Sequence, residues 1–176
     1  TLHPLQSFAD AITISESMDK IIDERKLKVV LTWAPHIKAL PQCVANSFAE
    51  WMNAWGKTDL TIACPAGFEL DPQFSGDAII TNEQDKALAD ADIVYVKNWS
   101  SYNNYGQTLV DPSWMLTKEK LKITNNAKVM HCLPVRRNVE LSDEVLDSSQ
   151  SLVTKQAANR VWSAQIVISE ILKTIS

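Results

Sequence analysis

The chain has 176 residues, of which 45% are hydrophobic and 22% are charged, and its formal net charge is −4. This length and composition are those of one globular domain, so they exclude wholesale disorder. The negative charge argues against a nucleic-acid partner, because phosphate binding requires a clustered basic surface. No apolar stretch reaches the length of a membrane span, so we expect no membrane partner.

Apolar segments rich in β-branched residues alternate with amphipathic segments along the chain. In chain order, the pattern predicts a strand at 28–33, a helix at 46–55, a strand at 60–64, a helix at 81–90, a strand at 92–96, a helix at 112–121, a strand at 127–132, a short helix after Ser142 and a long helix at 156–175. This alternation predicts a three-layer α/β fold, in which helices cover both faces of a parallel sheet. The last helix carries an apolar stripe formed by Ala157, Val161, Ala164, Ile168, Ile171 and Leu172.

Polar side chains follow three of the predicted strands. They are His36, then Lys97 with Asn98, then the segment 131–137 with its two arginines. Because parallel strands bring their carboxyl ends to one edge, Lys97, Arg136 and Arg137 are expected to converge on one anion, most simply a carboxylate. The pattern alone equally allows ordinary surface charges just beyond a strand.

Other polar residues have simpler interpretations from the pattern alone. His131 and Cys132 lie at the end of a buried strand, where a packed core role is the default, although nearby arginines would lower the pKa of the Cys132 thiol. His3 precedes Pro4 at a helix start and is either a cap or a residue near the chain end. Four scattered glycines cannot form a phosphate-cradling loop, and no zinc spacing is present. We therefore expect an enzyme without metal or organic cofactor.

Three motifs together resemble the ornithine-type carbamoyltransferases. His131-Cys132-Leu133-Pro134 is similar to the family signature, and His3-Pro4-Leu5-Gln6 resembles its second carbamoyl phosphate motif. Ala158-Asn159-Arg160 resembles the Glu-Asn-Arg segment of the family. The resemblance spans essentially the whole chain, and residues 135–138 are similar to the branch that acts on N-acetyl- or N-succinyl-L-ornithine.

Lys97 gives the assignment to this branch a physical basis. Ornithine carbamoyltransferases place an aspartate in the corresponding segment to meet the free α-ammonium of ornithine, and a Ser-Met-Gly loop follows it. In this sequence Lys97 occupies the position of that aspartate, and no Ser-Met-Gly is present. An acylated nitrogen has no charge and would leave a buried carboxylate unpaired, whereas a lysine can bind the α-carboxylate.

The resemblance also implies roles for individual residues. His3 and Cys132 would be catalytic, with His3 stabilising the oxyanion that forms on the carbamoyl group. Carbamoyl phosphate would be held by His3, Gln6, Cys132, Leu133 and Arg160. The acylornithine would be held by Lys97, Arg136 and Leu133. No role as a covalent nucleophile is expected for Cys132, because proximity and electrostatic stabilisation suffice for the reaction.

The resemblance finally implies how the chain is organised. We expect an interdomain helix at 1–25, an amino-acid-binding domain at 26–150, and a C-terminal helix at 151–176 that packs towards a carbamoyl phosphate domain. The Ser-x-Arg-Thr-Arg phosphate cradle of that domain is absent from the sequence, so this fragment alone is expected to be inactive. A cytoplasmic homotrimer with a trefoil knot near 35–41 is also implied. The alternatives are an ornithine carbamoyltransferase and a non-catalytic amino-acid-binding domain.

Overall fold

A five-stranded parallel sheet lies at the centre of the computed structural model, which describes residues 2–175. Its strand order is β3-β2-β1-β4-β5, and every neighbouring pair is parallel. The strands are β1 (Leu27–Trp33), β2 (Thr58–Ala63), β3 (Ile79–Thr81), β4 (Ile93–Lys97) and β5 (Lys128–Met130). The chain order reverses direction between β1 and β4, where ligands of open parallel sheets bind beyond the carboxyl ends of the strands. The predicted parallel α/β fold is confirmed.

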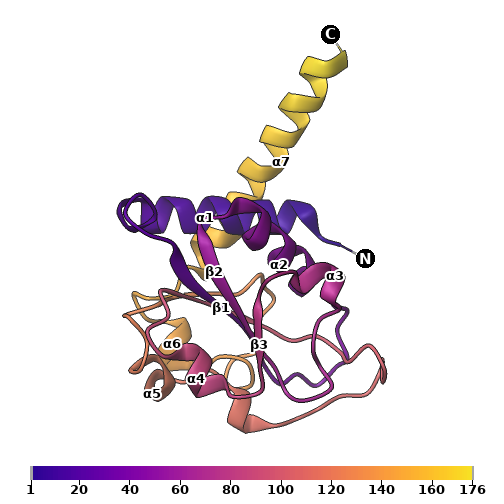
Figure 1. Cartoon of the computed structure of the whole chain (residues 1–176), viewed down its shortest axis with the longest axis vertical. Coiled ribbons are helices and arrows are strands. Elements are labelled where there is room, and N and C mark those ends of the chain that lie inside the picture. The colour runs from indigo at the N-terminus through magenta and orange to yellow at the C-terminus, as the bar shows by residue number, and fades with distance from the viewer. Residues whose placement is uncertain (1, 176) are drawn as a thin grey trace.

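Helices cover both faces of this sheet (Figure 1). One side carries α1, α2 and the first turns of α7, and the other side carries α4, α5 and α6. The helices are α1 (Pro4–Ile22), α2 (Cys43–Trp55), α3 (Pro72–Ser75), α4 (Gln84–Leu88), the 3₁₀ turn η1 (Pro112–Trp114), α5 (Lys118–Leu121), α6 (Asp143–Leu146) and α7 (Val153–Ile175). None of the helices within residues 2–175 is both long and apolar enough to cross a bilayer.

The core lies around the two central strands, which are buried on both faces. Its largest side chains include Trp33 on β1, Tyr95 on β4 and Phe48 on α2, none of which is exposed. The indole N–H of Trp33 donates to the carbonyl of Trp99 at 2.8 Å, and the Trp99 N–H donates to the carbonyl of Phe68 at 2.7 Å. Because both donors are satisfied, the indole rings of Trp33 and Trp99 are buried without an unpaired polar group.

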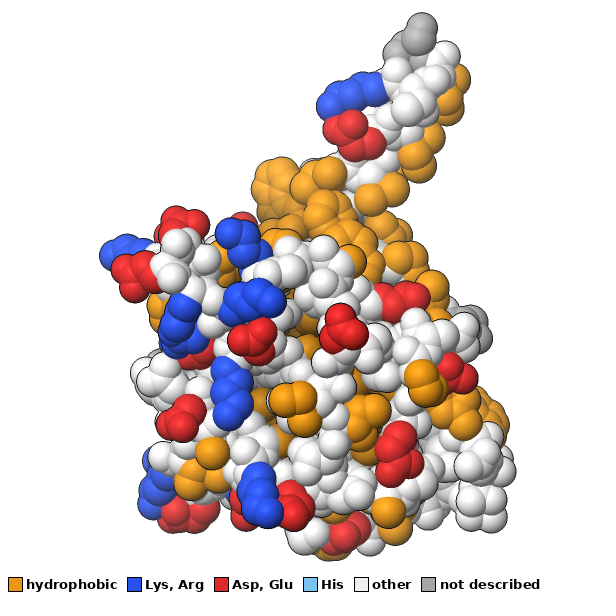
Figure 2. Space-filling model, viewed as in Figure 1, with side chains coloured by type: hydrophobic (Ala, Val, Ile, Leu, Met, Phe, Trp, Pro, Cys, Tyr) orange, Lys and Arg blue, Asp and Glu red, His pale blue; other side chains and the backbone are white. Residues whose placement is uncertain are grey.

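The helix α7 packs on α1 through polar side chains. Its polar residues Gln156, Asn159 and Ser163 are buried, and each bonds to α1. The predicted apolar stripe is instead largely exposed: Val161, Ile168, Ile171 and Leu172 each have more than half of their surface accessible. The C-terminal part of the helix projects from the body of the domain, and hydrophobic side chains gather along it (Figure 2).

Several element boundaries also differ from the prediction. The helix expected at 112–121 is two short pieces, because Leu116 between them exchanges backbone hydrogen bonds with Glu140 and Ser142. The short edge strand β3 was not predicted, and α4 begins only at Gln84. The last strand ends at Met130 rather than residue 132, since the backbone N–H of His131 donates to the Gln156 side chain.

Candidate active site

A cavity with a volume of about 560 Å³ lies beyond the carboxyl ends of β1, β4 and β5. It contains every residue to which the family resemblance gives a role in the site. The lining is formed by His3, Gln6, His36, Lys38, Leu40, Pro41, Cys43, Val44, Lys97, Cys132, Leu133, Pro134, Val135, Arg136 and Arg160. These residues come from the start of α1, from the segments after β1 and β5, from the end of β4 and from α7. The convergence follows from the parallel strand order, which brings distant sequence segments to one edge.

The charged side chains of this lining are all positive. It contains the cationic side chains of Lys38, Lys97, Arg136 and Arg160, and no Asp or Glu among the described residues. Lys97 is the last residue of β4 and only 7% exposed. Within residues 2–175, its ammonium group makes no hydrogen bond or ion pair with another side chain. A buried cation that faces a cavity in this way favours an anionic ligand.

Arg136 is held at the cavity by a histidine from another strand end. Its Nε lies 3.2 Å from Nε2 of His36, which follows β1. Since a guanidinium always donates, Nε2 of His36 must be the acceptor, and Nδ1 on the other side of the ring lies 2.9 Å from the carbonyl and 3.0 Å from the backbone N–H of Lys38. No hydrogen bond in the described part of the chain occupies the two terminal nitrogens of Arg136, so both can bind a carboxylate in forked geometry.

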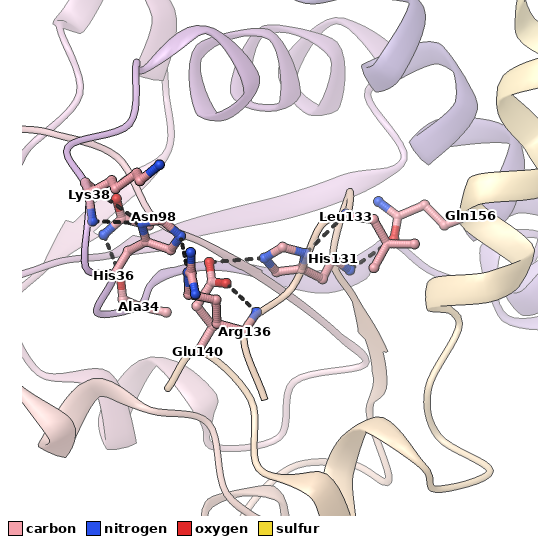
Figure 3. Close-up of polar contacts among 9 residues, drawn as sticks. All are labelled: Ala34, His36, Lys38, Asn98, His131, Leu133, Arg136, Glu140 and Gln156. Atoms are coloured by element: carbon pink, nitrogen blue, oxygen red, sulfur yellow. Dashed lines mark hydrogen bonds and ion pairs between the residues drawn. The ribbon is translucent and has the colours of Figure 1, made fainter. Parts of the chain in front are cut away.

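The loop that carries Arg136 is fixed by a buried pair, His131 and Glu140 (Figure 3). Nε2 of His131 lies 3.1 Å from Oε1 of Glu140, and Oε2 of Glu140 accepts from the Arg136 backbone N–H at 2.9 Å. The N–H of Leu133 donates to Nδ1 of His131 at 3.0 Å, so the proton of the neutral ring is on Nε2 and is donated to Glu140. The same bond holds Leu133 at a φ of 54°, a left-handed conformation that is unusual for leucine.

The pKa shifts of this pair agree with a neutral imidazole beside a carboxylate. Burial lowers the pKa of His131, in spite of its hydrogen bond to Glu140. Burial by itself would raise the pKa of Glu140, but the hydrogen bonds from His131 and the Arg136 backbone, with the charge of Lys97, hold it below its usual range. The pair therefore orients the loop and does not add a cation to the cavity.

Two expectations from the sequence were wrong. Arg137 does not line the cavity, because its guanidinium pairs with Asp143 and Asp147 at 2.8 and 2.7 Å on the outer side of the loop. The pKa of the Cys132 thiol is raised by burial and not lowered, because the opposing charge of Lys97 does not outweigh the loss of solvent. A thiol in this state is a poor nucleophile.

Residues 41–170 match the family model described as aspartate/ornithine carbamoyltransferase, Asp/Orn binding domain. This match covers well over half of the chain. The chain belongs to the aspartate/ornithine carbamoyltransferase family.

Several known carbamoyltransferases align with nearly all of the chain. It is 49% identical over 178 residues to an N-succinylornithine carbamoyltransferase of Bacteroides fragilis, covering 99% of this chain and 54% of that protein. It is 30% identical over 189 residues to an N-acetylornithine carbamoyltransferase of Xanthomonas campestris, covering 97% and 55%. The chain thus spans about half the length of the curated relatives that it matches.

The fold is that of solved carbamoyltransferases. A crystal structure of N-acetyl-L-ornithine transcarbamylase superposes with a TM-score of 0.85 at 30% identity, covering 96% of this chain and 57% of that one. A variant of that enzyme, complexed with carbamyl phosphate and N-succinyl-L-norvaline, gives the same TM-score, covering 96% and 56%. The resemblance drawn from the three sequence motifs is confirmed at the level of the family.

In this carbamoyltransferase domain, some residues that shape the cavity gave no clear sequence signal. Glu140 lies in a polar loop, and nothing in its surroundings indicates that its carboxylate is fully buried. His3 occupies the N-cap of α1 without a side-chain capping bond, and its backbone N–H donates to Ser47 at 2.6 Å. No group of three His, Cys, Asp or Glu side chains that could hold a metal ion occurs among residues 2–175.

Proposed function

We propose that the full-length protein transfers the carbamoyl group of carbamoyl phosphate to the δ-amine of an N-acyl-L-ornithine in arginine biosynthesis. The products are N-acyl-L-citrulline and phosphate, and the acyl group is succinyl or acetyl. The observation that carries the substrate assignment is the cavity lining, which has four cations and no carboxylate in the described part of the chain. A free α-ammonium would find no anionic partner there, whereas an acylated α-nitrogen needs none. The similarity to an N-succinylornithine carbamoyltransferase supports the same substrate class.

The reaction forms a bond between the δ-nitrogen and the carbamoyl carbon and breaks the bond from that carbon to the phosphate oxygen. Proposed roles follow the positions of the cavity residues. His3 donates a hydrogen bond to the carbamoyl oxygen as negative charge develops on it. Gln6 and Arg160 orient carbamoyl phosphate, and the backbone carbonyls of Cys132 and Leu133 accept its amide protons.

The second substrate is held by residues at the end of β4 and after β5. Lys97 and Arg136 bind the α-carboxylate of the acylornithine, and Leu133 lies against its side chain. A positively charged δ-ammonium cannot attack, and a cavity lined by cations favours its neutral form. Cys132 lies beside the attacking nitrogen, as a thiol that contacts the reacting atoms and not as a nucleophile.

The remaining part of the site is proposed to come from another domain of the same polypeptide. The relatives are nearly twice as long as this chain, and a Ser-x-Arg-Thr-Arg phosphate cradle is expected in their additional part. We assign 1–25 as the interdomain helix, 26–150 as the amino-acid-binding domain and 151–176 as the helix that packs towards the carbamoyl phosphate domain. The exposed apolar stripe of α7 supports this last assignment. A cytoplasmic homotrimer and a knot near 35–41 complete the proposal.

The proposal is tested by measuring citrulline-type product from carbamoyl phosphate with three acceptors in parallel. These are L-ornithine, N-acetyl-L-ornithine and N-succinyl-L-ornithine, each with the full-length protein. We expect turnover of one acylated substrate and little turnover of ornithine. Preference for free ornithine would refute the interpretation of Lys97, and no turnover of any acceptor would favour a non-catalytic binding domain.

Arg136→Ala separates the two halves of the site. We expect it to raise the KM for the acylornithine at least about tenfold, because it removes a charge-assisted hydrogen bond. The KM for carbamoyl phosphate should change far less. The reverse pattern would show that Arg136 binds the phosphate donor and that its assignment is wrong.

A further inference from the structure

Asp10 is a fully buried carboxylate that the proposed mechanism does not use. It lies on α1 one turn after Gln6, and its side chain has no exposed surface. Its Oδ1 accepts two hydrogen bonds, from Nε2 of Gln6 at 2.8 Å and from Nε2 of Gln156 on α7 at 2.7 Å. Burying a carboxylate costs the fold free energy. The position of Asp10 in the core therefore calls for an explanation.

These two bonds connect Asp10 to two of the groups that are proposed to hold carbamoyl phosphate. They are the Gln6 amide and the backbone carbonyls of Cys132 and Leu133. Gln6 lines the cavity, and the bond from its Nε2 to Asp10 leaves its Oε1 as an acceptor. Gln156, whose Nε2 also donates to Asp10, accepts through Oε1 from the backbone N–H of His131 at 2.9 Å. That bond ends β5 and sets the direction of the chain into Cys132.

The other carboxylate oxygen faces charged and titratable groups. Within residues 2–175, Oδ2 of Asp10 and the hydroxyl of Tyr95 on β4 are both buried without a hydrogen bond of regular geometry, and Tyr95 lies close enough to lower the pKa of Asp10. Cys132 after β5 and Arg160 on α7 also act on this cluster electrostatically. Burial raises the pKa of Asp10 to about 7, against the hydrogen bonds from Gln6 and Gln156 and the charge of Arg160.

We propose that Asp10 is a positioning residue for the carbamoyl phosphate half of the site. Its Oδ1 fixes the Gln6 amide directly and fixes the Cys132 and Leu133 carbonyls through Gln156 and the His131 backbone. The starts of α1 and α7 thereby meet at one oxygen atom, and Gln156 links the end of β5 to it. This inference rests on the proposed use of carbamoyl phosphate, and it adds a residue that does not itself touch the substrate.

The test compares variants of the full-length protein by the Kd for carbamoyl phosphate, the KM for both substrates and the melting temperature. Asp10→Ala removes the acceptor and is expected to raise the Kd and KM for carbamoyl phosphate by about tenfold or more, while the KM for N-succinylornithine changes less than about threefold. Asp10→Asn retains an oxygen at the position of Oδ1 and should return the Kd to within about threefold of wild type.

Thr13→Val is the matched control. Thr13 accepts from Asn159 at 3.0 Å in the same α1–α7 interface, one turn further along, and does not contact the cavity. Thr13→Val should lower the melting temperature and leave both KM values within about twofold of wild type, because it removes the hydrogen bonds of the Thr13 hydroxyl at the α1–α7 interface, away from the cavity. If Asp10→Ala does not fold, Gln156→Met tests the same link and should raise the Kd about fivefold, since it releases the His131 backbone.

These measurements separate a positioning role of Asp10 from a packing role. Equal effects of Asp10→Ala and Thr13→Val on carbamoyl phosphate, or an unchanged Kd in Gln156→Met, would reduce Asp10 to a packing residue. Wild-type protein that binds carbamoyl phosphate but does not turn over acylornithine would refute the proposed acceptor, and the Kd series would still test Asp10. Wild-type protein that does not bind carbamoyl phosphate would overturn the inference together with the proposed donor.

Discussion

Replacing Asp10 by asparagine should stabilise the fold, and the gain should grow with pH. The pKa of Asp10 is raised from 3.8 to about 7 by burial, so the folded state favours the neutral acid. A raised carboxyl pKa means that the stability contributed by this group is fully present below pH 3.8 and is lost as pH rises towards about 7. Asparagine has nearly the same shape and cannot ionise, so it escapes this loss.

The magnitude follows from the raised pKa. Between pH 3.8 and about 7 only the unfolded chain ionises at this position, so wild type loses about 1.36 kcal/mol of stability per pH unit relative to a residue that cannot ionise. The loss is about 2 kcal/mol at pH 5.5 and about 4 kcal/mol above pH 7. The free energy of unfolding of Asp10→Asn relative to wild type should therefore rise by about 2 kcal/mol between pH 5.5 and pH 8. The change between pH 5.5 and pH 8 is the quantity to measure, because the effect of asparagine on the hydrogen bonds is the same at both pH values and cancels.

The assay is urea denaturation of wild type and variant at pH 5.5, 6.5, 7.5 and 8. Asp92→Asn serves as a control without pH dependence in this range. Although burial opposes it, hydrogen bonds from Arg25, Lys28 and Asn125 lower the pKa of Asp92 below 3.8, so its contribution is fully present at all four pH values. Asp92→Asn should therefore destabilise by the same amount from pH 5.5 to pH 8. A difference between Asp10→Asn and wild type that stays constant across this range would refute the raised pKa and the argument built on it.

Three further predictions concern the cavity and one turn. Glu140→Gln places an amide donor against either the Nε2–H of His131 or the backbone N–H of Arg136, so it should destabilise the fold by about 1–3 kcal/mol in urea denaturation and raise the KM for the acylornithine. An unchanged KM would show that the His131–Glu140 pair does not position Arg136. Lys97→Met should raise the KM for the acylornithine about 10- to 100-fold in steady-state kinetics and spare that for carbamoyl phosphate, whereas equal effects on both would contradict its role. Gly76→Ala should cost more in urea denaturation than Gly67→Ala, because both glycines have positive φ values but only a Cβ at Gly76 meets Asn53, at 2.7 Å; equal costs would show that Asn53 moves freely.

The central strands and long helices were predictable because their sequence patterns come from burial itself. β1 and β4 are continuous apolar runs, which is what a strand covered on both faces requires. β3 was missed because three residues at a sheet edge, two of them exposed isoleucines, leave no periodic signal. The break at Leu116 comes from backbone pairing with a segment more than twenty residues away, which local propensity cannot indicate.

The site was predictable to the extent that sheet topology determines it. Lys97 and Arg136 meet because parallel strands end at one edge, and this required only the strand assignments. Gln6 and Arg160 came from the family motifs, since no pattern in the chain places α1 or α7 over that edge. Arg137 was assigned wrongly although its partners were visible: Asp143 and Asp147 follow it on one short helix and its C-cap.

The cation-rich cavity connects specificity with reactivity under the proposed function. Carbamoyl phosphate is an anion and the acylornithine carries an α-carboxylate, so positive charge in the cavity favours the binding of both. The same charges disfavour a δ-ammonium and so favour the neutral amine that attacks. An aspartate in place of Lys97 would provide a partner for a free α-ammonium, but beside the α-carboxylate of an acylornithine it would leave two anions without compensation. One substitution at the end of β4 therefore changes both which acceptor is bound and how readily its amine loses a proton. For this reason we propose that Lys97, more than the shape of the cavity, distinguishes an acylornithine site from an ornithine site.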